Sequence, residues 1–291
     1  SALNTAYASD GITGLGNEAA TLTDTSLSVS VLNTLDSNTT GSIDASTITT
    51  LTGTVSALNT AYASDGITGL GNEAVTLTDT SLSVSGLNTL DSNTTGSIDA
   101  NSITQFSGNA ADINTTITAT GITTATDYNV TVNDNPTLAQ LITLNNDTTG
   151  SITLSVTSDN LTGSMSDLLA AFSGSITAYS GNLTVTDTSL SVDNVNTLDS
   201  ATSGNVDVSA VATLTGTVSA LNSAYASSGI TGLGNEAVTI SDTSLSVSVL
   251  NTLDGNTTGS IDASTITAFT GTASALNTAY ASDGITGLGN E

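Results

Sequence analysis

The sequence repeats itself with a step of about 55 residues, and this repetition limits the fold more than any other feature. The phrase SALNTAYASDGITGLGNEA begins at Ser1 and again at Ser56. A column of glycines follows the same step: Gly41, Gly96, Gly150, Gly204 and Gly259. The halves SVLNTLDSNTTG and SALNTAYASDGITG are versions of one segment, so a coil has about 27 residues. Such coils are stable only when neighbours bury one another, which predicts a solenoid.

The repeat register runs through the whole chain. We expect residues 1–291 to form a single continuous array of 55-residue double-coil repeats, with a divergent copy at about 105–180. Ser1 and Glu291 fall in the middle of a repeat, which is typical of a fragment of a longer repeat region.

The divergent copy indicates where a coil is helical. Asn135 and Pro136 precede TLAQLITL, and Asn at the N-cap with Pro at the first position predicts a helix start. In SMSDLLAAF, Ser164 and Asp167 have the spacing of a capping box. By alignment, the repeated segments SVSVLNTL and VSALNTAYA are also predicted to be short helices.

Strand patterns alternate with these helices. SITLSVTS from Ser151, NVTVND, GNLTVTD from Gly181 and GNVDV from Gly204 place apolar residues at every second position. A strand and a helix in each coil require parallel strands with right-handed crossovers. We therefore predict an α/β solenoid, with one long parallel sheet and a row of short helices. An all-β solenoid, with the Leu-Asn segments as turns, is the alternative, because Val, Ile and Thr are abundant.

Four apolar columns are the candidate core. The two strand columns are Ile43, Ile98, Ile152, Val206 and Ile261, and Leu22, Leu77, Val132, Val185 and Ile240. The two helix columns are Leu35, Leu90, Leu144, Leu198 and Leu253, and Tyr7, Tyr62, Ile117, Phe172, Tyr225 and Tyr280.

The composition excludes several functions. The chain has no Lys, Arg, His or Cys, and its formal charge is -26. Nucleic acids and anionic membrane surfaces are therefore not expected as partners. Ser-His and Cys-His catalysis and the usual zinc, iron and copper sites have no residues to build them. No apolar stretch is long enough to span a membrane, so membrane insertion is not expected.

Repeated carboxylates are the remaining chemical feature. One column falls where strand passes to helix: Asp24, Asp79, Asp134, Asp187 and Asp242. Helix N-capping is the favoured interpretation, and a calcium site, with calcium as the cofactor, is the alternative. An active site is normally singular, whereas these residues recur in every repeat, so we expect no enzyme activity.

Three other acidic columns have simpler interpretations. Asp44, Asp99, Asp207 and Asp262, with Thr153 in the divergent copy, are expected to face solvent on the sheet. Asp36, Asp91, Asp199 and Asp254, with Asn145 in the divergent copy, are expected in turns after the helix. Glu18, Glu73, Glu236 and Glu291 lie in GLGNE loops, and the sequence suggests no partner for them.

The phrases LNTLDSNTTGSIDASTIT, LTGTVSALNTAYAS and GITGLGNEAVTLTDTS resemble repeat tracts of giant secreted or cell-surface proteins of cyanobacteria and marine bacteria. The resemblance covers essentially the whole chain. It implies an extracellular or cell-surface location and a structural, motility-associated or adhesive role.

Three functions are compatible with these features. The first is a fibre, filament or surface layer formed by coil stacking, with the chain itself as partner. The second is an adhesin stalk or spacer. The third is a calcium- or saccharide-binding array that uses the Thr/Asp face of the sheet. Ice binding would favour an uninterrupted Thr face, and the Asp column interrupts it.

Overall fold

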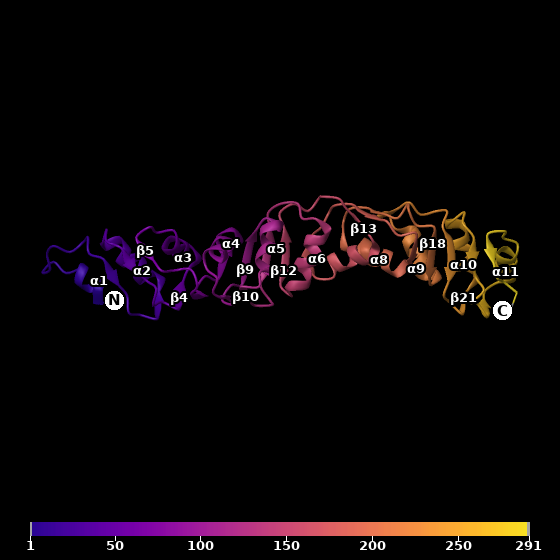
Figure 1. The fold of residues 1–291 in the computed structure, drawn as a ribbon. Helices are drawn as coiled ribbons and strands as arrows, with labels where there is room; N and C mark the ends of the chain where they lie inside the picture. Colours follow the sequence, from indigo (N-terminus) through magenta and orange to yellow (C-terminus); the bar gives the residue numbers. More distant parts are fainter. Residues whose placement is uncertain (1, 290–291) are drawn as a thin grey trace. The chain divides into compact units, whose positions relative to one another are not determined.

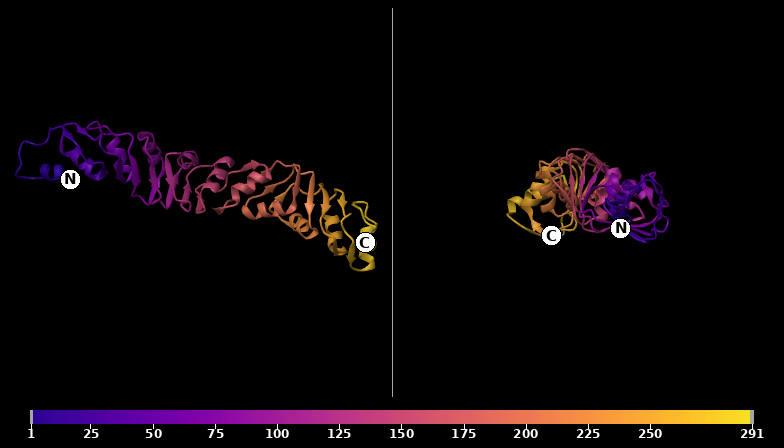
Figure 2. Two further views of the ribbon diagram at one scale, coloured as in Figure 1. Left: turned by 60° about the horizontal axis from the view of Figure 1, so that its bottom comes forward. Right: turned by 90° about the vertical axis from the view of Figure 1, so that its left-hand side faces the viewer.

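The computed structural model describes residues 2–289 and contains two compact units. The first comprises the described residues up to Pro136 together with Asn146–Ser155. The second comprises Thr137–Asn145 and the described residues from Val156 onward. Within each unit short helices alternate with parallel strands, as Figure 1 and Figure 2 show, so each is an α/β solenoid. The all-β alternative is therefore wrong, and the single continuous array stays a prediction.

The helices are 6 to 10 residues long and recur once in each coil. They are α1 Ala2–Tyr7, α2 Val29–Asn38, α3 Val55–Tyr62, α4 Val84–Asn93, α5 Ala110–Thr118, α6 Leu138–Asp147, α7 Met165–Phe172, α8 Val192–Ala201, α9 Val218–Ala226, α10 Val247–Asn256 and α11 Ala273–Tyr280.

The strands of the first unit are β1 Ala20–Thr21, β2 Ser26–Ser28, β3 Ile43–Asp44, β4 Thr50–Gly53, β5 Ile67–Thr68, β6 Ala74–Leu77, β7 Ser81–Ser83, β8 Ile98–Ala100, β9 Gln105–Gly108, β10 Ile122–Thr124, β11 Asn129–Val132 and β12 Ser151–Leu154. Those of the second unit are β13 Leu161–Gly163, β14 Ser175–Thr177, β15 Leu183–Val185, β16 Ser189–Ser191, β17 Val206–Asp207, β18 Thr213–Gly216, β19 Ile230–Thr231, β20 Ala237–Ile240, β21 Ser244–Ser246, β22 Ile261–Asp262, β23 Ala268–Thr270 and β24 Ile285–Thr286.

The helices form because an apolar residue recurs every third position, which creates one buried stripe. In α2 this stripe is Val29, Leu32 and Leu35. The predicted start of α7 is confirmed, because the Ser164 hydroxyl accepts a hydrogen bond from the Asp167 amide at 3.2 Å. A short helix of this kind has little stability alone and depends on burial of its stripe.

The predicted start of α6 at Asn135 and Pro136 is wrong by two residues. The helix begins at Leu138, and Thr137 and Gln140 form its capping box. The Gln140 amide donates to the Thr137 hydroxyl at 3.3 Å, and the Gln140 side-chain oxygen accepts from the Thr137 amide at 2.8 Å. This reciprocal pair satisfies two free amides at once, which a proline in the first turn does not do.

Separate parallel sheets replace the single long sheet that was expected. In the first unit the strand orders are β1-β3-β5 and β2-β4-β6-β8-β10. A third sheet has the order β7-β9-β11-β12 among the strands that belong to this unit. In the second unit they are β13-β15-β17-β19, β16-β18-β20-β22-β24 and β21-β23.

The sheets are interrupted because strands and helices advance by different steps. Leu51 pairs with Leu27 before it and with Val75 after it, so the strands advance by equal steps along the chain. Helices α2, α3 and α4 begin at Val29, Val55 and Val84, and both of these steps are longer than the strand step. From one coil to the next, each strand of this sheet therefore ends further ahead of the helix that follows it in the sequence. After β8 and β10 the sheet ends, while β7 has already started the next sheet directly before α4.

The predicted core is confirmed for three of the four columns. The two strand columns and the Leu35 column are buried at every position. The column that contains Tyr62 is only half-buried, and Tyr280 is 51% exposed. Several of these tyrosines bond through their hydroxyl groups to polar partners, as described below, and Ile117 and Phe172 of the same column are half-buried as well.

The glycine column marks the points where neighbouring coils touch through their backbones. A Cβ atom on Gly96 would lie 2.1 Å from the carbonyl oxygen of Glu73. The same contact occurs at Gly41, Gly150, Gly204 and Gly259, with distances of 1.9 to 2.4 Å. Only glycine can occupy a position where another backbone approaches so closely.

Candidate functional site

The carboxylates of the first column accept hydrogen bonds from helix N-termini. The helix in each case belongs to the preceding coil, and is not the helix that follows the carboxylate in the sequence. The Asp79 carboxylate accepts a hydrogen bond of 2.8 Å from the amide of Val55, the first residue of α3. The N-cap residue of that helix is Thr54, whose hydroxyl accepts from the Ala57 amide at 3.2 Å. Each carboxylate thus satisfies a second free amide at a positive helix end.

The same contact recurs along the column. Asp134 accepts from Ala110 at 2.7 Å, Asp187 from Met165 at 2.6 Å and Asp242 from Val218 at 2.7 Å. Asp24 lines a cavity beside α1. Within residues 2–289 no three acidic side chains lie close enough to hold a metal ion, and calcium at this column stays the alternative interpretation.

The second column lies at strand ends and closes tight turns. The Asp44 carboxylate accepts from the Ser46 amide at 3.1 Å, and Asp262 accepts from Ser264 at 3.0 Å. Hydrogen bonds from the serine hydroxyl and amide lower the pKa of both carboxyl groups. Asp99 and Thr153 are exposed, as expected for this column, whereas Asp44, Asp207 and Asp262 are half-buried.

The third column does not lie in turns, which corrects the prediction. Asp36, Asp91, Asp199 and Asp254 lie inside the helices, near their C-terminal ends. The Asp36 carboxylate accepts from the Ser64 hydroxyl of the next coil at 2.8 Å. Asp199 and Asp254 bind Ser227 and Ser282 in the same way. The prediction failed because the helices continue beyond the last residue of their apolar stripe.

Glu73 and Glu236 are fully buried, although the sequence suggested no partner for them. The Glu73 carboxylate accepts from the Tyr62 hydroxyl at 2.8 Å and from the Gly71 amide at 2.9 Å. Glu236 is bound by Tyr225 and Gly234 in the same arrangement. Glu18 accepts from Gly16 at 2.7 Å, and this backbone bond lowers the pKa of its carboxyl group. Glu291 lies outside the described residues.

The surroundings of four tyrosines, Tyr62, Tyr128, Tyr179 and Tyr225, raise the pKa of their hydroxyl groups. Burial raises the pKa of Tyr62, and the adjacent Glu73 carboxylate adds to the shift. In the divergent copy Tyr128 occupies the position of the loop glutamate, and it donates to Asp147 at the end of the following helix, α6. Burial is also the main cause that raises the pKa of Tyr128, and it raises the pKa of Tyr179 to about 12.

A ladder of asparagines connects the helices, and it explains the repeated Leu-Asn dipeptide. The Asn33 side-chain amide donates to the Ala57 carbonyl of the next helix at 2.9 Å. Asn59 donates to Gly86 at 2.8 Å and Asn88 to Asp112 at 3.0 Å. The same bond is made by Asn4, Asn145, Asn196, Asn222 and Asn251. The regular recurrence of Asn within an amphipathic helix was a signal for this ladder.

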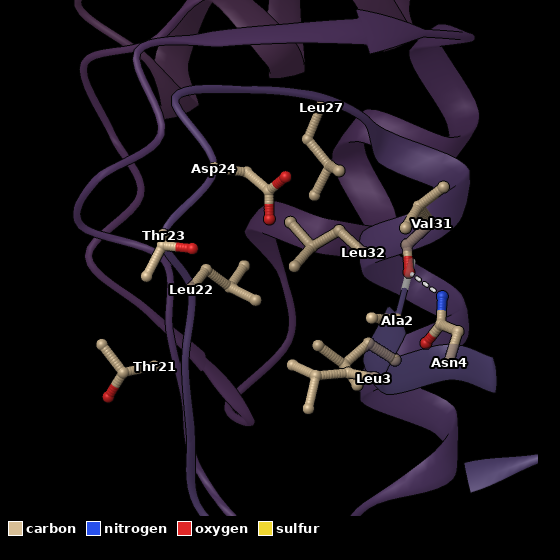
Figure 3. A pocket seen from close by; sticks show the side chains of 11 residues that line it. Ala2, Leu3, Asn4, Thr21, Leu22, Thr23, Asp24, Leu27, Val31 and Leu32 are labelled. Carbon is tan, nitrogen blue, oxygen red and sulfur yellow. Dashed lines mark hydrogen bonds between the residues drawn. The ribbon is translucent and has the colours of Figure 1, made fainter. Parts of the chain in front are cut away.

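Shallow grooves recur between successive helices. Figure 3 shows one of about 330 Å³, with Asp24, Leu27 and Leu32 directed toward it and Asn4 bonded to the Val31 carbonyl. Equivalent grooves lie between α3 and α4 and between α7 and α8, with volumes of about 590 and about 600 Å³. Each contains one carboxylate, and that carboxylate belongs to the first column.

Within residues 2–289 no helix has the length and apolar character needed to cross a membrane. No protein-family model, curated protein or solved structure matches the chain.

Proposed function

We propose that the chain is a structural repeat of an extracellular or cell-surface array that extends by head-to-tail stacking of coils. One observation carries the proposal: each coil has two unlike surfaces that are complementary to each other. In the coil of α3, the side that faces the preceding coil accepts, because the Ala57 carbonyl is bound by Asn33. The side that faces the next coil donates, because the Val55 amide bonds to the Asp79 carboxylate. The coil-to-coil interface is therefore directional and has no symmetry that would close it.

The interface is also rich in contacts that resist sliding. Besides strand pairing, the Thr49 amide and hydroxyl both bond to the Thr25 carbonyl of the preceding coil. The Thr94 hydroxyl bonds to the Glu73 carbonyl at 3.0 Å. Bonds of this kind fix the register between coils, as a filament or stalk under tension requires.

The experiment measures whether the 291-residue chain grows by end-to-end addition. Sedimentation velocity and negative-stain imaging measure the length of the assemblies over a range of protein concentrations. Moderate salt screens the charge of -26. Asn277, in α11, is the exposed equivalent of the ladder residue Asn222. We expect N277D to reduce growth, because it removes the donor and adds a charge.

Asn235→Asp is the matched control, since it adds the same charge on an exposed loop. Growth that both variants retain equally would mean that association does not use the coil interface. A chain that stays monomeric at every concentration would contradict self-association and favour the adhesin stalk.

A further inference from the structure

Two sheets present the same outward row of side chains, one in each unit. In the first unit this row is Ser28, Thr52, Thr76, Asp99 and Thr123, paired in register on β2, β4, β6, β8 and β10. In the second it is Ser191, Thr215, Thr239, Asp262 and Thr286, on β16, β18, β20, β22 and β24. We call each row a hydroxyl ladder. A shorter row runs beside each ladder: Ser26, Thr50 and Ala74, and Ser189, Thr213 and Ala237.

The central hydroxyls of the ladders are not used by the fold. Thr52, Thr76, Thr215 and Thr239 are exposed, and their hydroxyl groups make no hydrogen bond to any other described residue. Many other threonines do: Thr47 and Thr94 bond to carbonyls of the preceding coil, and Thr60 bonds to the Ser56 carbonyl in its own helix. The ladder hydroxyls therefore keep their full capacity to donate and accept hydrogen bonds.

These hydroxyls are also held at regular positions. Parallel strands lie about 4.8 Å apart, and the branched Thr side chain has few rotamers on a strand. Each ladder is thus a row of evenly spaced hydroxyls with little conformational entropy to lose on binding. A partner with a repeating row of hydroxyl groups can form the same bond several times, which multiplies weak contacts.

The charge of the ladders selects among such partners. Each contains one carboxylate, Asp99 or Asp262, and the chain has no cationic side chain, so polyanions are repelled. A neutral hydroxyl group, in contrast, donates a charge-assisted hydrogen bond to a carboxylate. Asp99 and Asp262 also make ice a poor ligand. A carboxylate would interrupt the match to the lattice of ice, which is neutral and does not favour a charge at that position.

We propose that the hydroxyl ladders bind a neutral, hydroxyl-rich polysaccharide through repeated hydrogen bonds to the Thr and Asp side chains. A single chain contains both ladders, so this binding does not depend on head-to-tail stacking. No aromatic residue belongs to either ladder, so there is no stacking on sugar rings and the affinity for a short oligosaccharide is low. Binding is therefore expected on long or insoluble polymers.

The test is depletion of the 291-residue protein from solution by insoluble cellulose, chitin and an insoluble α-glucan, with alginate gel as the polyanion. The ladder variant replaces Thr52, Thr76, Thr215 and Thr239 with Val, which keeps the branched shape and removes four hydroxyls. The matched control replaces Thr60, Thr89, Thr197 and Thr252 with Val. These four are exposed on helices and bond to their own helix backbone.

We expect the wild type to bind at least one neutral polymer and the ladder variant to bind it about tenfold more weakly, as the loss of several hydrogen bonds implies. The control should bind within about twofold of the wild type, since single hydroxyls on other surfaces make no contact. Circular dichroism confirms that both variants fold. A second variant, D99N with D262N, keeps the turns at these residues and should lose part of the binding.

Three outcomes would overturn the proposal. One is a wild type that none of the neutral polymers depletes. The second is equal loss of binding in the ladder and helix variants. The third is uptake into growing ice crystals with no binding to polysaccharide, which would identify ordered water as the ligand of these hydroxyls.

Discussion

The carboxylate of Asp79 lies 2.8 Å from the amide nitrogen of Val55, a residue 24 positions earlier in the chain. This bond joins the end of one strand to the start of a helix in the preceding coil. Because equivalent bonds recur at Asp134, Asp187 and Asp242, each of these carboxylates ties two coils together. The chain thus uses part of its large negative charge to hold the stack.

Replacing Asp79 with Ala should lower the free energy of unfolding by about 1 kcal/mol, because the Val55 amide loses its acceptor. Asp79→Asn keeps an acceptor and loses only the charge, so a smaller loss of about 0.5 kcal/mol is expected. Urea denaturation measures both. Asp65→Ala is the control, since Asp65 is exposed and its side chain has no bond within the described residues. If all three variants are equally stable, the contact does not contribute to stability.

Calcium should raise the melting temperature more than sodium does at equal ionic strength, because divalent ions can bridge carboxylates that have no internal cation. Scanning calorimetry in the two salts measures the difference. The response should survive when Asp24, Asp79, Asp134, Asp187 and Asp242 are changed to Asn, since helix amides already occupy four of these carboxylates. A response that disappears in this variant would instead place calcium at the column.

Gly96→Ala should destabilise the protein by about 2 to 4 kcal/mol, because the new methyl group would overlap the Glu73 carbonyl and push two coils apart. Gly255→Ala, in helix α10, is the opposite case. No atom lies within 4 Å of its added methyl group, so a gain of about 0.5 to 1 kcal/mol is expected from helix propensity. Chemical denaturation of the two variants compares a contact glycine with a free one. Similar stabilities would show that the coils can separate without cost.

Stability should decrease as the pH rises above about 10, the ordinary pKa of tyrosine in the unfolded chain. Burial raises the pKa of Tyr62, Tyr128 and Tyr225 in the folded protein, and that of Tyr179 to about 12. The folded state then holds more protons than the unfolded state, so the stability present below the unfolded pKa is lost as the pH approaches the folded values. The chain has no Lys, Arg or Cys, so tyrosine is the side chain that titrates in this range.

Denaturation midpoints at about pH 8 and about pH 11 measure this loss. Tyr128→Phe should lose less stability between the two pH values than the wild type does, even though it is less stable at the lower pH. Tyr280→Phe is the control, because that side chain is more than half exposed. An equal alkaline loss in all three proteins would contradict the role of the buried hydroxyls.

The sequence alone was sufficient to predict the coil architecture. The stripe of Val29, Leu32 and Leu35 and the alternation in Asn129–Val132 are local patterns, and each indicates its own secondary structure. Repetition then aligned ambiguous copies with clear ones such as Met165–Phe172. Burial of the strand columns followed, because a residue that faces inward in one coil faces inward in every coil.

Only the tertiary structure decided which residues meet between coils. The repeat length constrains the combined length of two successive coils. It does not determine which residue of one coil lies beside which residue of the next. Paired strands lie closer together in the sequence than successive helix starts do, so the sheets end where a continuous one was expected. The same stagger brings Asp79 to Val55 and Asn33 to Ala57, and no local pattern encodes it. These pairings depend on how neighbouring coils pack, which is a property of the stack and not of any single repeat.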